Sequence, residues 1–225
     1  MNPSIEIRLI RSTALVQGSN HELLSKINKL LNTTYHQSTL TGYDSDPLTF
    51  SKARIRAHDQ LVHELGPQGL ISVAVDTSIS LSDGANNVVA CASLKPYKGS
   101  PVNQWLGRTV EDERLDADAR SSSDLENWEV ATCASRDDPR YRGVGLVSRC
   151  VDVIVVELLR SRADHQPVKL YVSALHGSGR PEYWERRGFV RVGEPEHAPP
   201  GVWGSNEPFR IATLSKTVGI VSNGV

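Results

Sequence analysis

Hydrophobic and polar residues alternate along the chain with a period that predicts where strands and helices lie. Residues 4–11 (SIEIRLIR) alternate with a period of two, which is typical of a half-buried β-strand. Ser19 and Glu22 have the spacing of a capping box at the start of a helix. The apolar residues that follow share one helical face: Leu23, Leu24, Ile27, Leu30 and Leu31. A strand followed by an amphipathic helix is therefore predicted, with a second helical patch at residues 51–64.

Two runs of β-branched and apolar residues predict an antiparallel pair of strands in the middle of the chain. They cover residues 70–76 and 87–94, and the segment between them contains an Asp-Gly turn signal. Residues 98–126 are polar and rich in Ser and Asp, and they lack a sustained apolar period. We therefore expect a long connection there without secondary structure.

Strands and helices alternate again in the second half of the chain. Strands are predicted at residues 127–135, 168–174 and 208–214, with another beginning after Gly188. Helices are predicted from Gly145 to Arg162, with one apolar face, and around Pro181–Arg187. The order of elements predicts an α/β (α+β) fold with a mixed, mostly antiparallel central sheet of six to seven strands and helices on both faces.

Composition narrows the class of protein. The 225 residues form one predicted domain, residues 1–225, with the polar insertion at about 98–126. The formal net charge of -1 gives no basic excess, so no nucleic-acid partner is expected. No apolar run is long enough to span a membrane, and the three widely spaced cysteines are typical of reduced thiols. We expect a cytoplasmic protein, and the sequence leaves its oligomeric state open.

The loop RYRGVG at residues 140–145 carries the clearest chemical signal. It lies between a predicted strand and a predicted helix, where glycines let the backbone approach a ligand and helix N–H groups attract an anion. Arg140 and Arg142 would add charge-assisted contacts to a phosphate group. A dinucleotide fingerprint would need Gly in place of Ser148, and no Gly-Lys-Ser or Gly-Lys-Thr sequence is present.

Two blocks of sequence, RYRGVG at 140–145 and EYWERRGF at 182–189, resemble motifs of the GNAT superfamily of acetyl-CoA-dependent N-acyltransferases. The first matches the family's acyl-CoA loop, which reads Arg or Gln, two residues, Gly, one residue, Gly or Ala. The second is similar to its short helix that ends in Gly-Phe. With the preceding strand, the resemblance spans residues 127–192. It implies a GNAT-like acyl-CoA N-acyltransferase fold, acetyl-CoA as co-substrate and no metal.

The resemblance also implies which residues hold acetyl-CoA. Backbone amides of residues 141–145 would bind the pyrophosphate, and the strand backbone at residues 133–135 would pair with the pantetheine arm. The Cys133 amide would polarise the thioester carbonyl, as a preorganised donor stabilises an oxyanion. The implied cofactor-binding residues are Cys133, Ala134, Ser135, Arg140, Tyr141, Arg142, Gly143, Val144, Gly145 and Trp184.

The acceptor amine requires a general base. An alkylamine with a pKa near 10.4 is neutral in only about one part in 2,500 at pH 7, and only the neutral form attacks. Glu129 lies eleven residues before Arg140, in the register where the histone acetyltransferase branch of the family places its Glu base. The alternatives are that Glu129 is an outward-facing strand residue, and that His176 is the base.

The general acid is less well marked. Many family members have a Tyr where this chain has Trp184, and that Tyr protonates the leaving thiolate. Tyr183 is the candidate replacement, and its alternative role is packing on the sheet. The branch with a Glu base also lacks a hydroxyl at this position, which agrees with Glu129 as the base.

The acceptor itself is predicted to be a small-molecule primary amine, attacked directly in a ternary complex. The composition does not favour a strongly acidic surface for basic histone tails, although a protein lysine or N-terminal amine remains the alternative acceptor. A CoA-binding sensor module without useful turnover is the alternative from a different class. Acidic residues could attract a cationic acceptor or form a solvated surface; they are Asp44, Asp46, Asp112, Glu113, Asp116 and Asp118. Trp105 and Trp203 could border the acceptor pocket.

Overall fold

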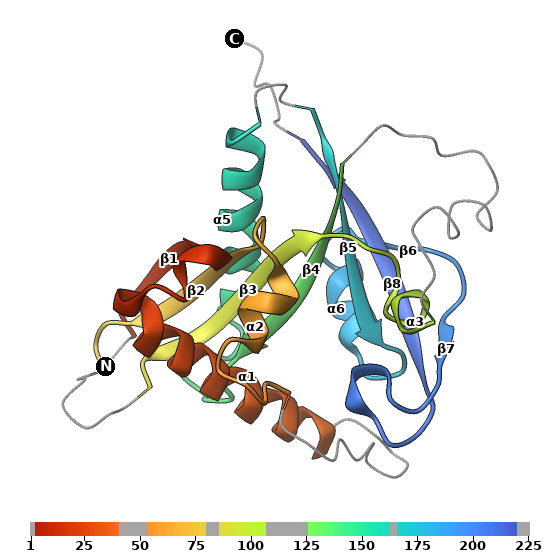
Figure 1. Cartoon of the computed structure of the whole chain (residues 1–225), viewed down its shortest axis with the longest axis horizontal. Helices are drawn as coiled ribbons and strands as arrows, with labels where there is room; N and C mark the ends of the chain where they lie inside the picture. The colour runs from red at the N-terminus through yellow and green to blue at the C-terminus, as the bar shows by residue number, and fades with distance from the viewer. Residues whose placement is uncertain (1–2, 41–53, 80–85, 107–125, 163–165, 220–225) are drawn as a thin grey trace. The chain divides into compact units, whose positions relative to one another are not determined.

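The computed structural model of the chain describes residues 3–40, 54–79, 86–106, 126–162 and 166–219 (Figure 1). The contacts divide the chain into two compact units. Unit 1 comprises Met1–Ser38, Lys52–Pro96 and Val130–Ser161, and unit 2 comprises Thr39–Ser51, Tyr97–Glu129 and Arg162–Val225. Strand β4, Glu126–Ser135, runs from unit 2 into unit 1. The organisation as one domain stays a prediction.

Unit 1 is built on three antiparallel strands, β1, β2 and β3, joined at one side by the second part of β4. Its strands and helices are β1 (Ile5–Arg11), β2 (Leu70–Asp76), β3 (Val88–Pro96), α1 (His21–Leu40), α2 (Gln60–Leu65) and α5 (Leu146–Arg160). Two 3-10 turns, η1 (Ser12–Ala14) and η2 (Gly18–Asn20), precede α1. The predicted antiparallel pair and the first strand are confirmed.

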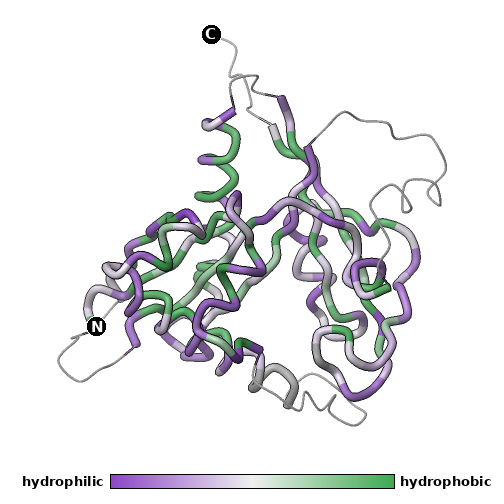
Figure 2. The backbone as a smooth tube through the Cα atoms, in the orientation of Figure 1, coloured by the Kyte–Doolittle hydropathy of each residue, from purple (hydrophilic) through white to green (hydrophobic). Residues whose placement is uncertain are grey.

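Helices cover both faces of this sheet. Alternate residues of β2, namely Ile71, Val73 and Val75, join the apolar faces of α1 and α2 in one buried cluster. Helix α5 contacts β1, β2 and β3, and none of its residues belongs to that cluster. Figure 1 shows α1 and α2 on one side of the strands and α5 on the other. Figure 2 shows apolar residues along these strands and along α5, and the buried ones in α5 include Leu146, Cys150 and Ile154.

Unit 2 contains the first part of β4 and four further strands. These are β5 (Val168–Leu175), β6 (Val190–Arg191), β7 (Glu196–Ala198) and β8 (Phe209–Val218). β4 and β5 are parallel from the pair Glu126–Val168 to the pair Glu129–Tyr171. β8 runs antiparallel to the whole of β5 and also pairs with β6 and β7. The remaining elements are α3 (Pro101–Trp105), α6 (Arg180–Glu185) and η4 (Val202–Gly204).

The mixed, mostly antiparallel sheet is confirmed, but it has eight strands in the described part of the chain rather than six to seven. The additional strand is β7, which has only three residues, Glu-His-Ala, and no apolar alternation to mark it. It is held by its pairing with Phe209–Ile211 of β8. The pattern of side chains along the sequence therefore carried no signal for it.

Two helix predictions need correction. Helix α3 lies in the stretch predicted to lack secondary structure, because Ser100 Oγ accepts a hydrogen bond from Asn103 N at 3.2 Å and Pro101 occupies the first turn. Residues 107–125 of that stretch lie outside the described residues. The helical patch predicted at 51–64 is a helix only from Gln60 to Leu65, while residues 51–53 are not described.

Two features are absent from the described residues. None of the described helices is long and apolar enough to cross a membrane. The same residues hold no group of three or more His, Cys, Asp and Glu side chains that could ligate a metal ion. The cytoplasmic location stays a prediction.

Candidate functional site

The loop between β4 and α5 has a backbone that requires glycine at two positions. Gly143 has a φ of +74° and Gly145, the residue before α5, has a φ of +69°. A Cβ atom at either position would meet no heavy atom within 4 Å, so the requirement is conformational rather than steric. Residues other than glycine adopt this left-handed region at a cost of about 1–2 kcal/mol. The two glycines turn the chain into the first turn of a fifteen-residue helix.

This geometry suits a phosphate group. The first N–H groups of a helix have no acceptor within the helix, and they carry the positive end of its dipole. Among the described residues, the amides of Arg142, Gly143, Val144 and Gly145 also have no hydrogen-bond acceptor. The two preceding amides are used within the turn, because Arg140 N donates to Asp138 Oδ1 and Tyr141 N donates to Asp138 O, both at 2.9 Å. The donors available to an anion therefore begin at Arg142, one residue later than predicted.

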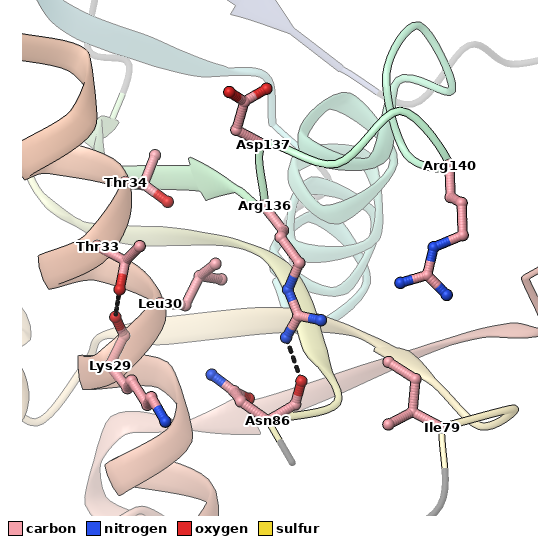
Figure 3. Close-up of a pocket in the computed structure, with 9 residues that line it drawn as sticks. All are labelled: Lys29, Leu30, Thr33, Thr34, Ile79, Asn86, Arg136, Asp137 and Arg140. Carbon is pink, nitrogen blue, oxygen red and sulfur yellow. Dashed lines mark hydrogen bonds between the residues drawn. The ribbon is translucent and has the colours of Figure 1, made fainter. Parts of the chain in front are cut away.

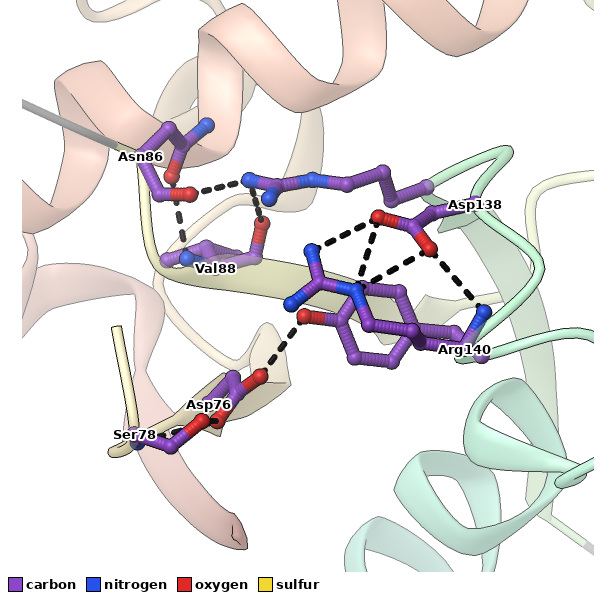
Figure 4. Close-up of polar contacts among 8 residues, drawn as sticks. Asp76, Ser78, Asn86, Val88, Asp138 and Arg140 are labelled. Carbon is purple, nitrogen blue, oxygen red and sulfur yellow. Dashed lines mark hydrogen bonds and ion pairs between the residues drawn. The ribbon is translucent and has the colours of Figure 1, made fainter. Parts of the chain in front are cut away.

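Tyr141 anchors the loop to Asp76, at the end of β2, which Figure 4 labels. Its side chain is 4% exposed, and its hydroxyl donates to Asp76 Oδ2 at 2.7 Å. Asp76 is fully buried, and its Oδ1 accepts hydrogen bonds from Ser78 N at 2.9 Å and Ser78 Oγ at 2.6 Å. The role seen for the Tyr141 side chain is therefore to hold the loop in place.

Tyr141 and Asp76 shift each other's pKa. Burial alone would raise the pKa of Asp76, but hydrogen bonds from Ser78 and Tyr141 outweigh it, so the pKa lies below its usual value. Burial, together with the hydrogen bond to Asp76, raises the pKa of Tyr141 to about 12. At neutral pH the pair is a phenol that donates to a carboxylate, which is a charge-assisted hydrogen bond.

Arg136 makes a second connection between the loop and the β2–β3 hairpin. Its guanidinium donates to the carbonyl oxygens of Asn86 and, at 3.3 Å, Val88, while its amide donates to Val89 O at 2.7 Å. Neither Arg136 nor Asp76 was predicted as a site residue. Their contacts join residues 50 and 65 positions apart in the chain, and no local pattern of residues encodes such a pair.

The two arginines predicted to bind phosphate are paired with aspartates of their own loop. Arg140 contacts Asp138 at 2.7 Å, and Arg142 contacts Asp137 at 2.8 Å. The hydrogen bonds from Arg140 lower the pKa of Asp138 to about 2, so this carboxylate is ionised at neutral pH. The arginines therefore offer a ligand less net charge than the sequence suggested.

Strand β4 carries the predicted base and the predicted strand contacts. Glu129 is 8% exposed and lies opposite Tyr171 of β5, whose ring stacks on Tyr97 with centroids 4.0 Å apart. The pairing with β5 ends at Glu129, and β4 continues through Cys133 to Ser135. Ser135 O accepts a hydrogen bond from Thr34 Oγ1 of α1 at 3.3 Å.

Helix α6 presents the two aromatic residues of the second motif. The Tyr183 ring lies 3.5 Å from the Arg187 guanidinium carbon, a cation–π contact. Trp184 is 6% exposed and packs edge-on against Phe189, with centroids 5.2 Å apart. Gly188, with a φ of +80°, follows the helix as predicted. The structure thus shows packing for Trp184, and its contact with a cofactor stays a prediction.

Comparisons with known proteins identify the fold of the chain. No protein-family profile and no curated protein sequence matches the chain. Solved structures do match it, and that of Arabidopsis thaliana NAA60 in complex with a bisubstrate analogue has a TM-score of 0.56 and 13% identity, over 96% of this chain and 99% of that chain. FeeM, an N-acyl amino acid synthase from uncultured soil microbes, gives 0.55 and 14%, over 95% and 90%. A putative acetyltransferase from Acinetobacter baylyi ADP1 gives 0.53 and 15%, over 96% and 94%.

The chain has the GNAT fold. This confirms the fold class that the two motifs implied. At these identities the likeness concerns the fold alone, so the roles of Glu129, Tyr183 and the Cys133 amide stay predictions.

Of the three cysteines of this GNAT fold, Cys91 and Cys150 are buried and Cys133 is half-buried. Burial raises the pKa of Cys91 and Cys133 well above the usual value and that of Cys150 to about 11. All three are therefore protonated at neutral pH, whereas nucleophilic attack requires the thiolate. Direct transfer from the thioester stays a prediction.

The remaining candidates are partly located. His176 follows β5 and is half-buried, and its amide donates to Arg210 O at 2.9 Å. Trp105 and Trp203 are both exposed, and a Cβ atom on Gly201 would lie 2.6 Å from the Trp105 ring. The two acidic groups at residues 44–46 and 112–118 lie outside the described residues.

Proposed function

We propose that the chain is an N-acetyltransferase that transfers the acetyl group of acetyl-CoA to a small-molecule primary amine. The observation that carries this proposal is the loop at residues 142–145. Gly143 and Gly145 have positive φ angles, and the four amides of the loop have no acceptor among the described residues. The loop leads directly into the first turn of α5. A diphosphate is a suitable ligand for such an array of N–H groups. The GNAT fold supports the same assignment.

Acetyl-CoA would be bound by backbone groups. The amides from Arg142 to Gly145 and the first turn of α5 hold the pyrophosphate. The pantetheine arm pairs with β4 beyond Glu129, where the pairing with β5 has ended. The Cys133 amide donates to the thioester oxygen, and this contact strengthens as negative charge develops on that oxygen.

Starting from the ammonium form of the amine, the transfer removes two protons from the nitrogen and supplies one to the sulfur. Glu129 accepts a proton from the attacking amine, directly or through water, because the protonated amine has no lone pair for attack. The nitrogen then bonds to the carbonyl carbon and loses its second proton to water, and the C–S bond of the tetrahedral intermediate breaks. Tyr183 supplies the proton that converts the CoA thiolate into the thiol. The products are an N-acetylated amine and free CoA.

A first experiment tests binding and turnover together. Calorimetric titration with CoA measures binding, and release of free thiol measures acetyl transfer from acetyl-CoA to small amines, lysine peptides and peptides with a free N-terminus. We expect saturable CoA binding and thiol release with one or a few small amines. Release with peptides alone would replace the proposed acceptor class by a protein amine. Binding without release for any amine would favour a CoA sensor, and absence of binding would refute the proposal.

A second experiment tests the base. Glu129→Gln removes the proton acceptor while keeping the shape of the side chain, so kcat should fall about 100-fold or more with little change in CoA affinity. Glu126→Gln is the matched control, because it removes an exposed carboxylate from the same strand. A wild-type rate that is constant from pH 6 to 9, or equal rates for the two variants, would remove Glu129 from the mechanism.

A further inference from the structure

Strand β1 forms one edge of the sheet and lies wholly in unit 1. Its seven residues, Ile5–Arg11, pair with β2 in an unbroken register, and no other strand of the described residues pairs with it. A regular edge strand leaves a row of backbone N–H and C=O groups that a further strand can bind. The free edge of β1 is therefore a candidate interaction surface.

The hydrogen bonds at the two ends of β1 show which of its backbone groups are directed outwards. Ser4 O accepts a hydrogen bond from Thr77 N at 2.8 Å, and Ser12 N donates to Gly69 O at 2.9 Å. In an antiparallel pair only every second residue exchanges hydrogen bonds with the partner strand. The even-numbered residues of β1 therefore bond to β2, and the outward groups belong to Ile5, Ile7, Leu9 and Arg11.

The side chains of β1 divide into a charged face and an apolar face. Glu6 and Arg8 are half exposed and form an ion pair with each other at 2.8 Å. Ile5, Ile7 and Leu9 point to the opposite face, where α5 contacts β1, and each of them is only partly buried. A strand added at this edge would therefore meet one positive charge, one negative charge and a row of apolar side chains.

A second copy of β1 matches this pattern in the antiparallel orientation. Outward groups must meet outward groups, so the odd-numbered residues of one copy must lie opposite odd-numbered residues of the other. With Ile7 on the two-fold axis, Glu6 of each copy lies opposite Arg8 of the other copy, and Ile5 lies opposite Leu9. The adjacent registers that also satisfy the outward groups place Glu6 opposite Glu6 or Arg8 opposite Arg8, and like charges directly opposite each other are destabilising.

We propose that the chain forms a symmetric dimer in which β1 pairs antiparallel with β1 of a second copy, with Ile7 on the two-fold axis. Two Glu6–Arg8 pairs then join the copies, and the row of Ile5, Ile7 and Leu9 continues across the interface, which removes partly exposed apolar surface from water. Pro3 has no N–H to donate, so it limits the paired segment at its start. Because the interface is confined to one strand, the dimer should dissociate on dilution. It requires nothing of the proposed CoA site.

Sedimentation velocity of the full chain over a hundredfold range of concentration tests the dimer. We expect a monomer–dimer equilibrium for the wild type. Arg8→Glu places like charges opposite each other at both pairs, so the dissociation constant should rise about tenfold or more. Thermal unfolding checks that the variant is folded.

Lys29→Glu is the matched control. It makes the same change of charge in the same unit, but Lys29 is an exposed residue of α1 that lines the pocket of about 510 Å³ in Figure 3, and it does not belong to β1. This variant should dimerise like the wild type. A wild type that stays monomeric at every concentration, or equal effects of Arg8→Glu and Lys29→Glu, would overturn the inference.

A mixing experiment tests the register. Glu6→Arg, like Arg8→Glu, should weaken the dimer when it is alone, because each variant then carries two like charges on β1. In an equimolar mixture the charges are complementary again in the proposed register, so the two variants should associate about as tightly as the wild type. A mixture that associates no more tightly than either variant alone would overturn the proposed register.

Hydrogen exchange locates the interface independently of any substitution. The outward amides of Ile5, Ile7 and Leu9 should gain protection as the concentration of the wild type rises, whereas those of Glu6 and Arg8, which bond to β2, should change little. A dimer that leaves the three outward amides unprotected would use another surface and would overturn the inference. None of these outcomes bears on CoA binding, so the proposed function is judged by its own experiments.

Discussion

The hydrogen bond between Tyr141 and Asp76 should contribute substantially to stability, and Tyr141→Phe removes it with little change in volume. The acceptor is a fully buried carboxylate and the distance is 2.7 Å. A hydrogen bond to a charged group is worth about 1.5–3 kcal/mol. For a chain of this size, about 2–4 °C of melting temperature corresponds to each kcal/mol, so we expect a decrease of about 3–12 °C.

A double-mutant cycle isolates this contact from other effects. Equilibrium unfolding in urea gives the free energies of the wild type, Tyr141→Phe, Asp76→Asn and the double variant. Because the two side chains touch, the effects should not be additive, and the coupling free energy should exceed about 0.5 kcal/mol. A change below about 0.5 kcal/mol for Tyr141→Phe, with additive effects, would show that the contact does not hold the loop.

The same pair predicts a dependence of stability on pH. The pKa of Asp76 is lowered in the folded state, so its contribution to stability is complete above the pKa of the unfolded chain, about 3.9, and is lost as the pH falls through the folded value. In Tyr141→Phe one of the hydrogen bonds that oppose the effect of burial is gone. The folded pKa of Asp76 is then closer to that of the unfolded chain, so Tyr141→Phe should lose less stability on acidification than the wild type, as measured by urea unfolding between pH 3 and 7.

Two further predictions concern the loop glycines and the thiols. Gly145→Ala and Gly193→Ala both place alanine at a φ of +69° in open space, so each should lower the free energy of unfolding by about 1–2 kcal/mol, but only Gly145→Ala should weaken CoA binding in calorimetry. An equal effect of the two variants on CoA affinity would contradict the role of the loop. Because burial raises the pKa of Cys150 to about 11 and that of Cys91 further, both thiols should react with an aromatic disulfide at pH 8 only after unfolding; rapid reaction in the native protein would contradict this.

The sequence predicted the elements whose signal is local and periodic. The alternation at residues 4–11 marked β1, the run of β-branched and apolar residues at 70–76 marked β2, and the apolar face after Gly145 marked α5. Elements held by tertiary contacts were missed. β7 exists through its pairing with β8, and α3 depends on a cap at Ser100 within a polar stretch.

The candidate site was likewise predicted only where its signal is local in the sequence. The position of the loop and its glycines was evident from RYRGVG, because positive φ angles before a helix require glycine. The burial of Tyr141 and the partners Asp76 and Arg136 were not, since they depend on side chains from distant segments. The spacing of Asp138 and Arg140 in the turn is compatible with an ion pair. Only the structure shows that the Asp138 carboxylate pairs with the Arg140 guanidinium and neutralises its charge.

These contacts suggest how the loop combines rigidity with affinity for a polyanion. Tyr141 and Arg136 fix it to the β2–β3 hairpin, so its amides are held in position before a ligand arrives and binding requires little ordering of the backbone. The aspartates that neutralise Arg140 and Arg142 keep the loop from carrying a strong positive field of its own. At the proposed CoA site, affinity for the pyrophosphate would then come from the oriented N–H groups of residues 142–145 more than from the charges of the loop arginines.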